Sequence, residues 1–191
     1  MTRLSDKEFK AMNRTPRQLL QRCWEFPTLK RFEVPITGQD VLEVGCGSGY
    51  GALLLATLEP KSYIGFDFME EQLAIAHKRL PKTEFIQQDA ANMQAIASVS
   101  KDTVVVFGVL HHIPEWKAAV REIARVLRPG GEVYLEEPDG SVLEWFDRKF
   151  HWGHPVFFRL EDLETYVQEN GFEILRRKYS FGFGFYRLKK R

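Results

Sequence analysis

The hydrophobic pattern between residues 40 and 136 changes repeatedly from that of a buried strand to that of an amphipathic helix. The run 103–107 is continuous and rich in valine, which is typical of a strand buried on both faces of a parallel sheet. Segment 115–127 instead places its apolar residues at helical spacing. The pattern predicts strands at 40–44, 63–67, 83–88, 103–107 and 132–136, separated by helices that include 49–58, 70–80 and 115–127.

The order of these elements predicts the fold class. A regular alternation of strands and helices indicates right-handed crossovers between parallel strands. The chain ends with a helix at 160–170 and two strands, 172–178 and 181–188, whose link is too short for a helical crossover. We therefore expect an α/β fold with a doubly wound, Rossmann-like, mostly parallel seven-stranded sheet that closes with a C-terminal antiparallel hairpin.

The residues ahead of this pattern, 1–38, have helical spacing and predict an N-terminal helical cap. Ser5 and Glu8 form a capping-box pair, and Thr15 and Gln18 form a second pair. Two interpretations of the cap remain open. Either it packs on the core of the domain formed by residues 39–191, or it closes over a bound substrate.

Residues 138–158 interrupt the alternation with a long connection that is rich in Trp, Phe and His. Long connections in compact domains commonly serve as lids or binding segments. We expect a substrate-binding or lid insertion here, and the alternative is that the aromatic side chains only cover the sheet.

Glycines gather at 45–51, between the strand 40–44 and the helix that follows it. Glycine lets the backbone approach a ligand closely, and a helix N-terminus offers N–H groups and a positive dipole end. Asp67 and Asp89 each end a predicted strand, and parallel sheets bind ligands beyond the carboxyl ends of their strands. The turn and the two carboxylates indicate a site for a nucleotide-like cofactor.

Five motifs follow one another along the chain. They are Val41-Leu42-Glu43-Val44-Gly45-Cys46-Gly47-Ser48-Gly49, Gly65-Phe66-Asp67, Gln88-Asp89-Ala90, the segment 108–114 and Leu127-Arg128-Pro129-Gly130-Gly131. In this order and spacing they resemble the class I S-adenosylmethionine-dependent methyltransferases that act on small molecules. The resemblance covers about residues 38 to 138 together with the final helix and hairpin. It implies that residues 39–191 bind S-adenosylmethionine and that the protein is an enzyme.

The resemblance also implies roles for single residues. The turn glycines would contact the methionyl part of the cofactor through backbone, and Asp67 would accept hydrogen bonds from the ribose. For Glu43, support of its own turn and direct contact with the cofactor remain alternatives. The residues implied in cofactor binding are Glu43, Gly45, Gly47, Gly49, Asp67, Phe68, Met69, Asp89, Ala90, Gly108 and Val109.

Methyl transfer by in-line displacement needs a general base only when the acceptor arrives protonated. His111 stands just past the strand 103–107 and is the leading candidate, with a purely pocket-shaping role as the alternative. His151 and His154 lie in the aromatic segment and would act from a lid. His112 is interpreted as structural. No spacing of His, Cys, Asp or Glu resembles a metal-ligand set, so we expect no metal.

The composition favours one class of methyl acceptor and one cellular compartment. A formal net charge of +1 predicts no general attraction to nucleic acid or to membranes. No apolar run is long enough to span a bilayer, and the 2 cysteines suggest no disulfide framework, so the cytoplasm is the expected compartment. The aromatic segment favours a small aromatic or hydrophobic acceptor. The oligomeric state is left open.

Proteins of other functional classes would show some of the same sequence features. The basic end of the chain, 176–191, would suit an RNA or protein methyltransferase, although the alternation of Phe181, Phe183 and Phe185 with glycines favours packing in the core. A non-catalytic module that binds S-adenosylmethionine would carry the same motifs. A nicotinamide dehydrogenase would need a second mononucleotide-binding half, and the chain closes with a hairpin instead.

Overall fold

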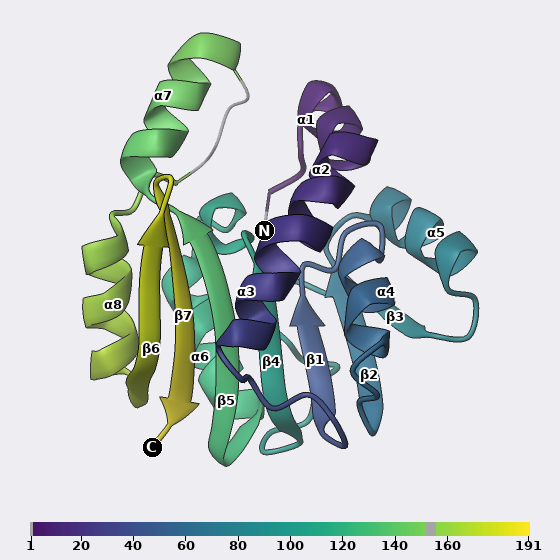
Figure 1. Ribbon diagram of the computed structural model, residues 1–191, viewed down its shortest axis with the longest axis vertical. Coiled ribbons are helices and arrows are strands. Elements are labelled where there is room, and N and C mark those ends of the chain that lie inside the picture. The colour runs from purple at the N-terminus through teal and green to yellow at the C-terminus, as the bar shows by residue number, and fades with distance from the viewer. Residues whose placement is uncertain (1, 152–155) are drawn as a thin grey trace.

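A seven-stranded sheet forms the centre of the computed structural model, which describes residues 2–151 and 156–191 (Figure 1). The strands are β1 (Asp40–Val44), β2 (Ser62–Asp67), β3 (Glu84–Gln87), β4 (Lys101–Phe107), β5 (Leu127–Pro138), β6 (Phe172–Ser180) and β7 (Phe183–Lys190). Their order in the sheet is β3-β2-β1-β4-β5-β7-β6. β1 to β5 are parallel, and β7 is antiparallel to β5 and to β6. The predicted fold class is therefore confirmed.

Helices cover both faces of this sheet (Figure 1). Strand side chains alternate between the two faces, so Val105 packs toward α3 (Phe26–Arg31) and α4 (Tyr50–Ala56). Val104 packs instead toward α6 (Trp116–Val126) and α8 (Leu160–Glu169). The central strand β4 is thus buried on both faces, which explains its continuous apolar run. The remaining helices of the domain are α5 (Glu70–Arg79), the 3-10 turn η2 (Leu110–His112) and α7 (Gly140–Phe150).

The N-terminal segment forms α1 (Asp6–Met12), α2 (Thr15–Leu20) and the π-helical η1 (Gln21–Glu25), which leads directly into α3. Ser5 caps α1 as predicted, because its side chain accepts the Glu8 N–H at 3.4 Å. Thr15 is already helical, and Arg14 precedes α2 without a side-chain cap. α3 packs on the sheet, whereas α1 and α2 rise beyond the tip of β1 (Figure 1). These two helices therefore lie above the carboxyl edge of the sheet (Figure 1).

The helix α7 occupies much of the segment in which the sequence indicated a long connection. Asp139 caps it by accepting the Ser141 N–H at 2.9 Å. α7 rises beside the turn of the β6–β7 hairpin (Figure 1), where a Cβ on Gly182 would lie 2.3 Å from the Val142 side chain. Phe181 at this turn is 90% exposed, so its predicted packing in the core is wrong.

The strand register brings one end of each central strand to a common edge. Val44 lies beside Phe66 of β2 and beside Val106 of β4, and Phe107 lies beside Glu136 of β5. Residues that directly follow these positions therefore meet at the carboxyl edge of the sheet, where parallel sheets bind ligands.

Candidate functional site

Three glycines in the turn after β1 adopt left-handed backbone conformations, with φ of 65° at Gly45, 52° at Gly47 and 73° at Gly49. Larger residues rarely adopt this conformation. A Cβ on Gly45 would lie 2.6 Å from the Val109 side chain, and a Cβ on Gly49 would lie 3.0 Å from the Ala76 Cβ. A Cβ on Gly47 would meet nothing within 4 Å. Close packing thus requires the first and third glycines, while the space beside the Gly47 Cα is open among the described residues.

Asp67 connects this turn to the end of β2. One of its carboxylate oxygens accepts the Gly47 N–H at 2.9 Å, and the other accepts the Met69 N–H at 2.9 Å. Burial raises the pKa of the Asp67 carboxyl, and these backbone hydrogen bonds oppose that rise by favouring the ionised form. The carboxylate therefore fixes the position of the glycine turn relative to Phe68 and Met69.

Glu43 is buried on β1 beneath the same turn. The Tyr63 hydroxyl donates a hydrogen bond to its carboxylate. A Cβ on Gly51 would lie only 2.1 Å from Glu43 Oε1, so the glycine at this position leaves room for the carboxylate. Burial raises the pKa of Glu43 to about 8. The side chain can therefore hold a proton at neutral pH and ionise beside a cationic ligand group.

A pocket lies between the glycine turn and the N-terminal cap. Gln72 lines it with a buried Oε1 that has no hydrogen-bond partner in the part of the chain that the structure describes, which leaves an acceptor for a ligand N–H or O–H. From the N-terminal segment, the lining includes Leu4, Met12, Asn13, Arg17, Gln18 and Gln21. Of the predicted cofactor residues, it includes Glu43, Gly45, Gly47, Asp67, Phe68, Met69, Gly108 and Val109.

Glu137 organises the backbone at the end of β4, although it belongs to β5. Its fully buried carboxyl group accepts the Val109 N–H at 2.7 Å and the Leu110 N–H at 2.6 Å. His111 Nδ1 lies 2.8 Å from the second carboxyl oxygen. Burial raises the pKa of Glu137 to about 8. This one side chain therefore fixes both the turn η2 and the ring of His111.

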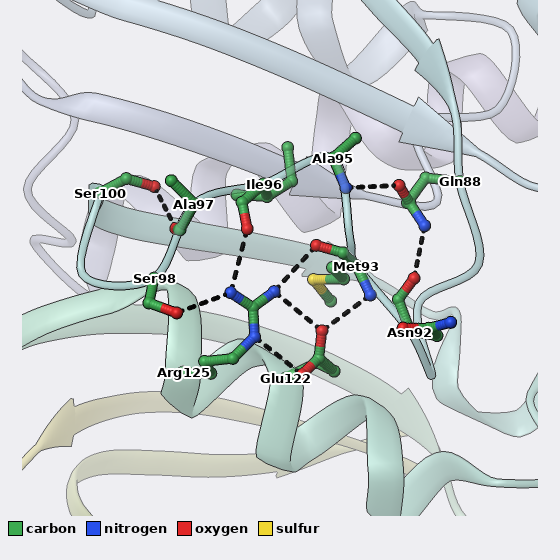
Figure 2. Close-up of polar contacts among 10 residues, drawn as sticks. All are labelled: Gln88, Asn92, Met93, Ala95, Ile96, Ala97, Ser98, Ser100, Glu122 and Arg125. Atoms are coloured by element: carbon green, nitrogen blue, oxygen red, sulfur yellow. Dashed lines mark hydrogen bonds and ion pairs between the residues drawn. The ribbon is translucent and has the colours of Figure 1, made fainter.

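The loop between β3 and β4, which contains the predicted adenine-binding pair, is held by α6 (Figure 2). Arg125 donates five hydrogen bonds, to the Met93 and Ile96 carbonyls, to Ser98 and to both oxygens of Glu122. Glu122 in turn accepts the Met93 N–H at 2.7 Å. This network fixes the loop that follows Asp89 and Ala90.

The predicted adenine-binding pair does not line the pocket. Ala90 is completely buried, and the Asp89 carboxylate accepts the Ala91 N–H at 2.9 Å. Gly49 also lies outside the lining, where it packs against α5. Among the described residues, no cluster of three or more His, Cys, Asp or Glu side chains is suited to hold a metal ion.

Comparison with known proteins shows which protein family the chain belongs to. A model of the methyltransferase domain family matches residues 9–177, which is most of the chain. The chain belongs to the class I S-adenosylmethionine-dependent methyltransferases. The resemblance found in the motifs is thereby confirmed, and S-adenosylmethionine is the cofactor of this family.

Relatives of the methyltransferase include two mycobacterial proteins. A probable S-adenosylmethionine-dependent methyltransferase of Mycolicibacterium smegmatis is 38% identical over 138 residues, which are 72% of this chain and 53% of that protein. A phthiotriol/phenolphthiotriol dimycocerosates methyltransferase of Mycobacterium leprae is 36% identical over 118 residues, which are 59% of this chain and 43% of that protein. The chain spans about half the length of these curated relatives.

A solved structure shares the fold of the methyltransferase across its whole length. It is a chain from the complex between the Haloferax volcanii Trm112 methyltransferase activator and a methyltransferase, with a TM-score of 0.80 and 17% identity. The match covers 100% of this chain and 99% of that chain. Among the described residues, no helix has both the length and the apolar character needed to cross a membrane.

Among the histidines considered in the sequence of the methyltransferase, His111, His112 and His151 lie in different surroundings. His111, the leading candidate for a base, is held against Glu137 and does not line the pocket. His112 does line it, 3.7 Å from a Glu8 carboxylate oxygen, and its ring centroid lies 4.0 Å from that of His111. His151 is exposed at the end of α7 and is not part of the lining, and His154 lies outside the described residues.

Several site residues were missed because their partners are distant in sequence. Arg17 and Gln72 reach the pocket from helices that carry none of the recognised motifs. Tyr63 lies 20 positions from Glu43, and Glu137 lies 26 positions from His111. Glu137 did carry one signal, because it directly follows the predicted strand 132–136, just as Asp67 ends its own strand.

Proposed function

We propose that this methyltransferase transfers a methyl group from S-adenosylmethionine to a small aromatic or hydrophobic acceptor. The observation that carries the proposal is the pocket between the glycine turn and the N-terminal cap, where Leu4, Met12 and Phe107 add apolar surface to a polar turn. The relative from Mycobacterium leprae is named for phthiotriol and phenolphthiotriol dimycocerosates, which is consistent with an acceptor of this class.

The described residues fit the cofactor at several points. The space beside the Gly47 Cα is open, and Asp67 ends β2 where a ribose would lie. Phe68 and Met69 offer apolar surface for an adenine ring. The unpartnered Gln72 Oε1 and the buried Glu43 carboxyl group provide acceptors for the hydroxyl or ammonium groups of the ligand.

The cofactor supplies a methyl group activated by a sulfonium, so the protein mainly has to align the acceptor and exclude water. Proximity and orientation of this kind can contribute about 7–11 kcal/mol to lowering the barrier. In the proposed arrangement the carbonyl groups near Gly108 lie beside the positive charge of the donor. The cap residues Leu4 and Met12 shield the pocket from solvent.

Within this proposal His112 is the group that takes a proton from the acceptor. It lines the pocket, and its Nε2 lies 3.7 Å from a carboxylate oxygen of Glu8, which orients the ring. The Thr2 N–H donates to the His112 carbonyl at 2.8 Å and so ties this residue to the cap. His111 and Glu137 act as positioning residues for the turn that carries His112.

Replacement of His112 by glutamine tests this assignment. We expect turnover to fall by about a hundredfold or more because the proton acceptor is lost. Affinity for S-adenosylhomocysteine, measured by calorimetry, should stay unchanged. His77→Gln is the matched control, since His77 packs against Phe85 with ring centroids 5.5 Å apart and lies outside the pocket. A loss confined to cofactor affinity would contradict the role of His112.

The acceptor class is tested by incubating the purified protein with methyl-labelled S-adenosylmethionine and cell extract separated into lipid, small-molecule, RNA and protein fractions. We expect label in the lipid fraction or in aromatic small molecules. Label in RNA or protein would contradict the proposed acceptor. Binding of S-adenosylhomocysteine without label in any fraction would indicate a non-catalytic module.

A further inference from the structure

One positive charge of the N-terminal cap faces the pocket. Arg17, on α2, is the only Lys or Arg among the described residues that line it. Its side chain is 22% exposed, so it reaches the pocket partly shielded from water. The strands of the sheet contribute the carboxyl groups of Glu43 and Asp67 to the same lining. The pocket is therefore polarised, with a cation on the cap side and acids on the sheet side.

The guanidinium group of Arg17 is held in place by one ion pair that uses only some of its N–H groups. Its Nη1 lies 2.7 Å and 2.9 Å from the two carboxylate oxygens of Glu25. In the described part of the chain, both of these contacts use Nη1, which leaves the N–H groups of Nε and Nη2 for a further anion. Glu25 is buried, and its carbonyl accepts the Tyr134 hydroxyl at 3.2 Å. The ion pair thus anchors Arg17 to the sheet.

The ligand of such a pocket must match its polarity. The amino-acid end of S-adenosylmethionine carries an ammonium group and a carboxylate a few ångströms apart. A carboxylate taken out of water requires a cation or several N–H donors, and a guanidinium supplies both. The ammonium group is complementary to the carboxyl group of Glu43, which β1 contributes to the lining.

We propose that Arg17 binds the α-carboxylate of the cofactor, so that the N-terminal cap forms part of the cofactor site as well as covering the acceptor. The inference rests on the proposed placement of S-adenosylmethionine over the glycine turn. It follows that the amino-acid end of the cofactor holds α2 in position, since Arg17 would contact Glu25 and the ligand at once.

The test compares three ligands by calorimetry on the full chain. S-adenosylhomocysteine carries the carboxylate and the ammonium group, its decarboxylated analogue keeps only the ammonium group, and methylthioadenosine lacks both. Arg17→Met is combined with Glu25→Gln, because the methionine alone would leave a buried carboxylate without its cation. Glu25→Gln alone and Arg14→Met, which changes an exposed residue outside the pocket, are the controls.

In the wild type and in both controls we expect S-adenosylhomocysteine to bind more tightly than the decarboxylated analogue. In the double variant its affinity should fall by about tenfold to a hundredfold, because a charge-assisted contact is lost. Affinities for the decarboxylated analogue and for methylthioadenosine should stay unchanged, and the latter also shows that the pocket is folded. Arg17→Lys keeps the charge beside Glu25 but loses the planar fork, and should show a smaller loss confined to S-adenosylhomocysteine.

Two results would overturn the proposal on different grounds. If the double variant still prefers S-adenosylhomocysteine to its decarboxylated analogue as strongly as the wild type, Arg17 does not bind the carboxylate. If the wild type binds none of the three ligands, the cofactor placement itself is wrong, and with it the proposed function of the pocket.

Discussion

At the scale of single residues, carboxyl groups at the ends of strands hold the site together. Asp67 accepts backbone N–H groups on both sides, from Gly47 and from Met69. Glu137 does the same for Val109 and Leu110 after β4. Each carboxylate replaces the hydrogen bonds that a turn cannot make within itself. The loops at the carboxyl edge are therefore ordered by side chains of neighbouring strands.

Replacement of Asp67 by alanine tests this arrangement in the proposed cofactor site. We expect the affinity for S-adenosylhomocysteine to fall by about 1–3 kcal/mol, because the ribose loses its acceptor and the turn loses the bond to Gly47. Calorimetry measures the change. Asp67→Asn retains one acceptor oxygen and should lose less. An unchanged affinity in Asp67→Ala would show that the ribose does not lie at the end of β2.

At the scale of elements, α6 does more than cover the sheet. Its inner face packs Ala119 and Ile123 into the core, and Arg125 near its end binds the loop between β3 and β4 (Figure 2). The loop contains little regular structure, so its backbone groups depend on such partners. A helix on one face of the sheet thereby positions the loop that follows the carboxyl end of β3.

Arg125→Ala should loosen this loop without unfolding the domain. We expect amide hydrogen exchange at Met93, Ala95 and Ile96 to rise by about tenfold or more, because the hydrogen bonds that close the loop are lost. Mass spectrometry or NMR can follow these amides. Arg121→Ala on the same helix is the matched control, since Arg121 donates to the exposed Tyr166 hydroxyl instead. Equal exchange in both variants would mean that Arg125 does not hold the loop.

At the scale of the whole molecule, buried acids make stability depend on pH. Burial raises the pKa of Glu43 and of Glu137 from the ordinary value of 4.5 to about 8. Between these two values the folded chain keeps protons that the unfolded chain has released. The free energy of unfolding therefore falls as pH rises through this window, by up to about 1.4 kcal/mol per pH unit for each carboxyl group.

Chemical denaturation at several pH values between 5 and 8 measures this slope. We expect the free energy of unfolding to decrease with rising pH in the wild type and to decrease less steeply in Glu137→Gln, which has no proton to release at this site. Glu173→Gln, an exposed substitution on β6, should follow the wild type. A Glu137→Gln variant with the wild-type slope would show that Glu137 is ionised in the folded chain.

The sequence determined the architecture because its signals are local. Strand and helix periods, the glycine turn and the acid at Asp67 all arise within short windows, and their order alone predicts a parallel sheet with its ligand edge. The same holds for the motifs that identify the family. The helix α7 is an exception, because its aromatic residues suggested a connection while its cap at Asp139 is a helical signal.

Only the tertiary structure decided which side chains meet in the pocket. His111 and His112 are adjacent in sequence but have different partners. His111 lies against Glu137, whereas His112 lies near Glu8 and its carbonyl accepts a hydrogen bond from Thr2, 110 positions away. Arg17 faces the glycine turn because α2 folds back over the carboxyl edge of the sheet. Contacts across such distances are set by how the elements pack, and no local pattern encodes them.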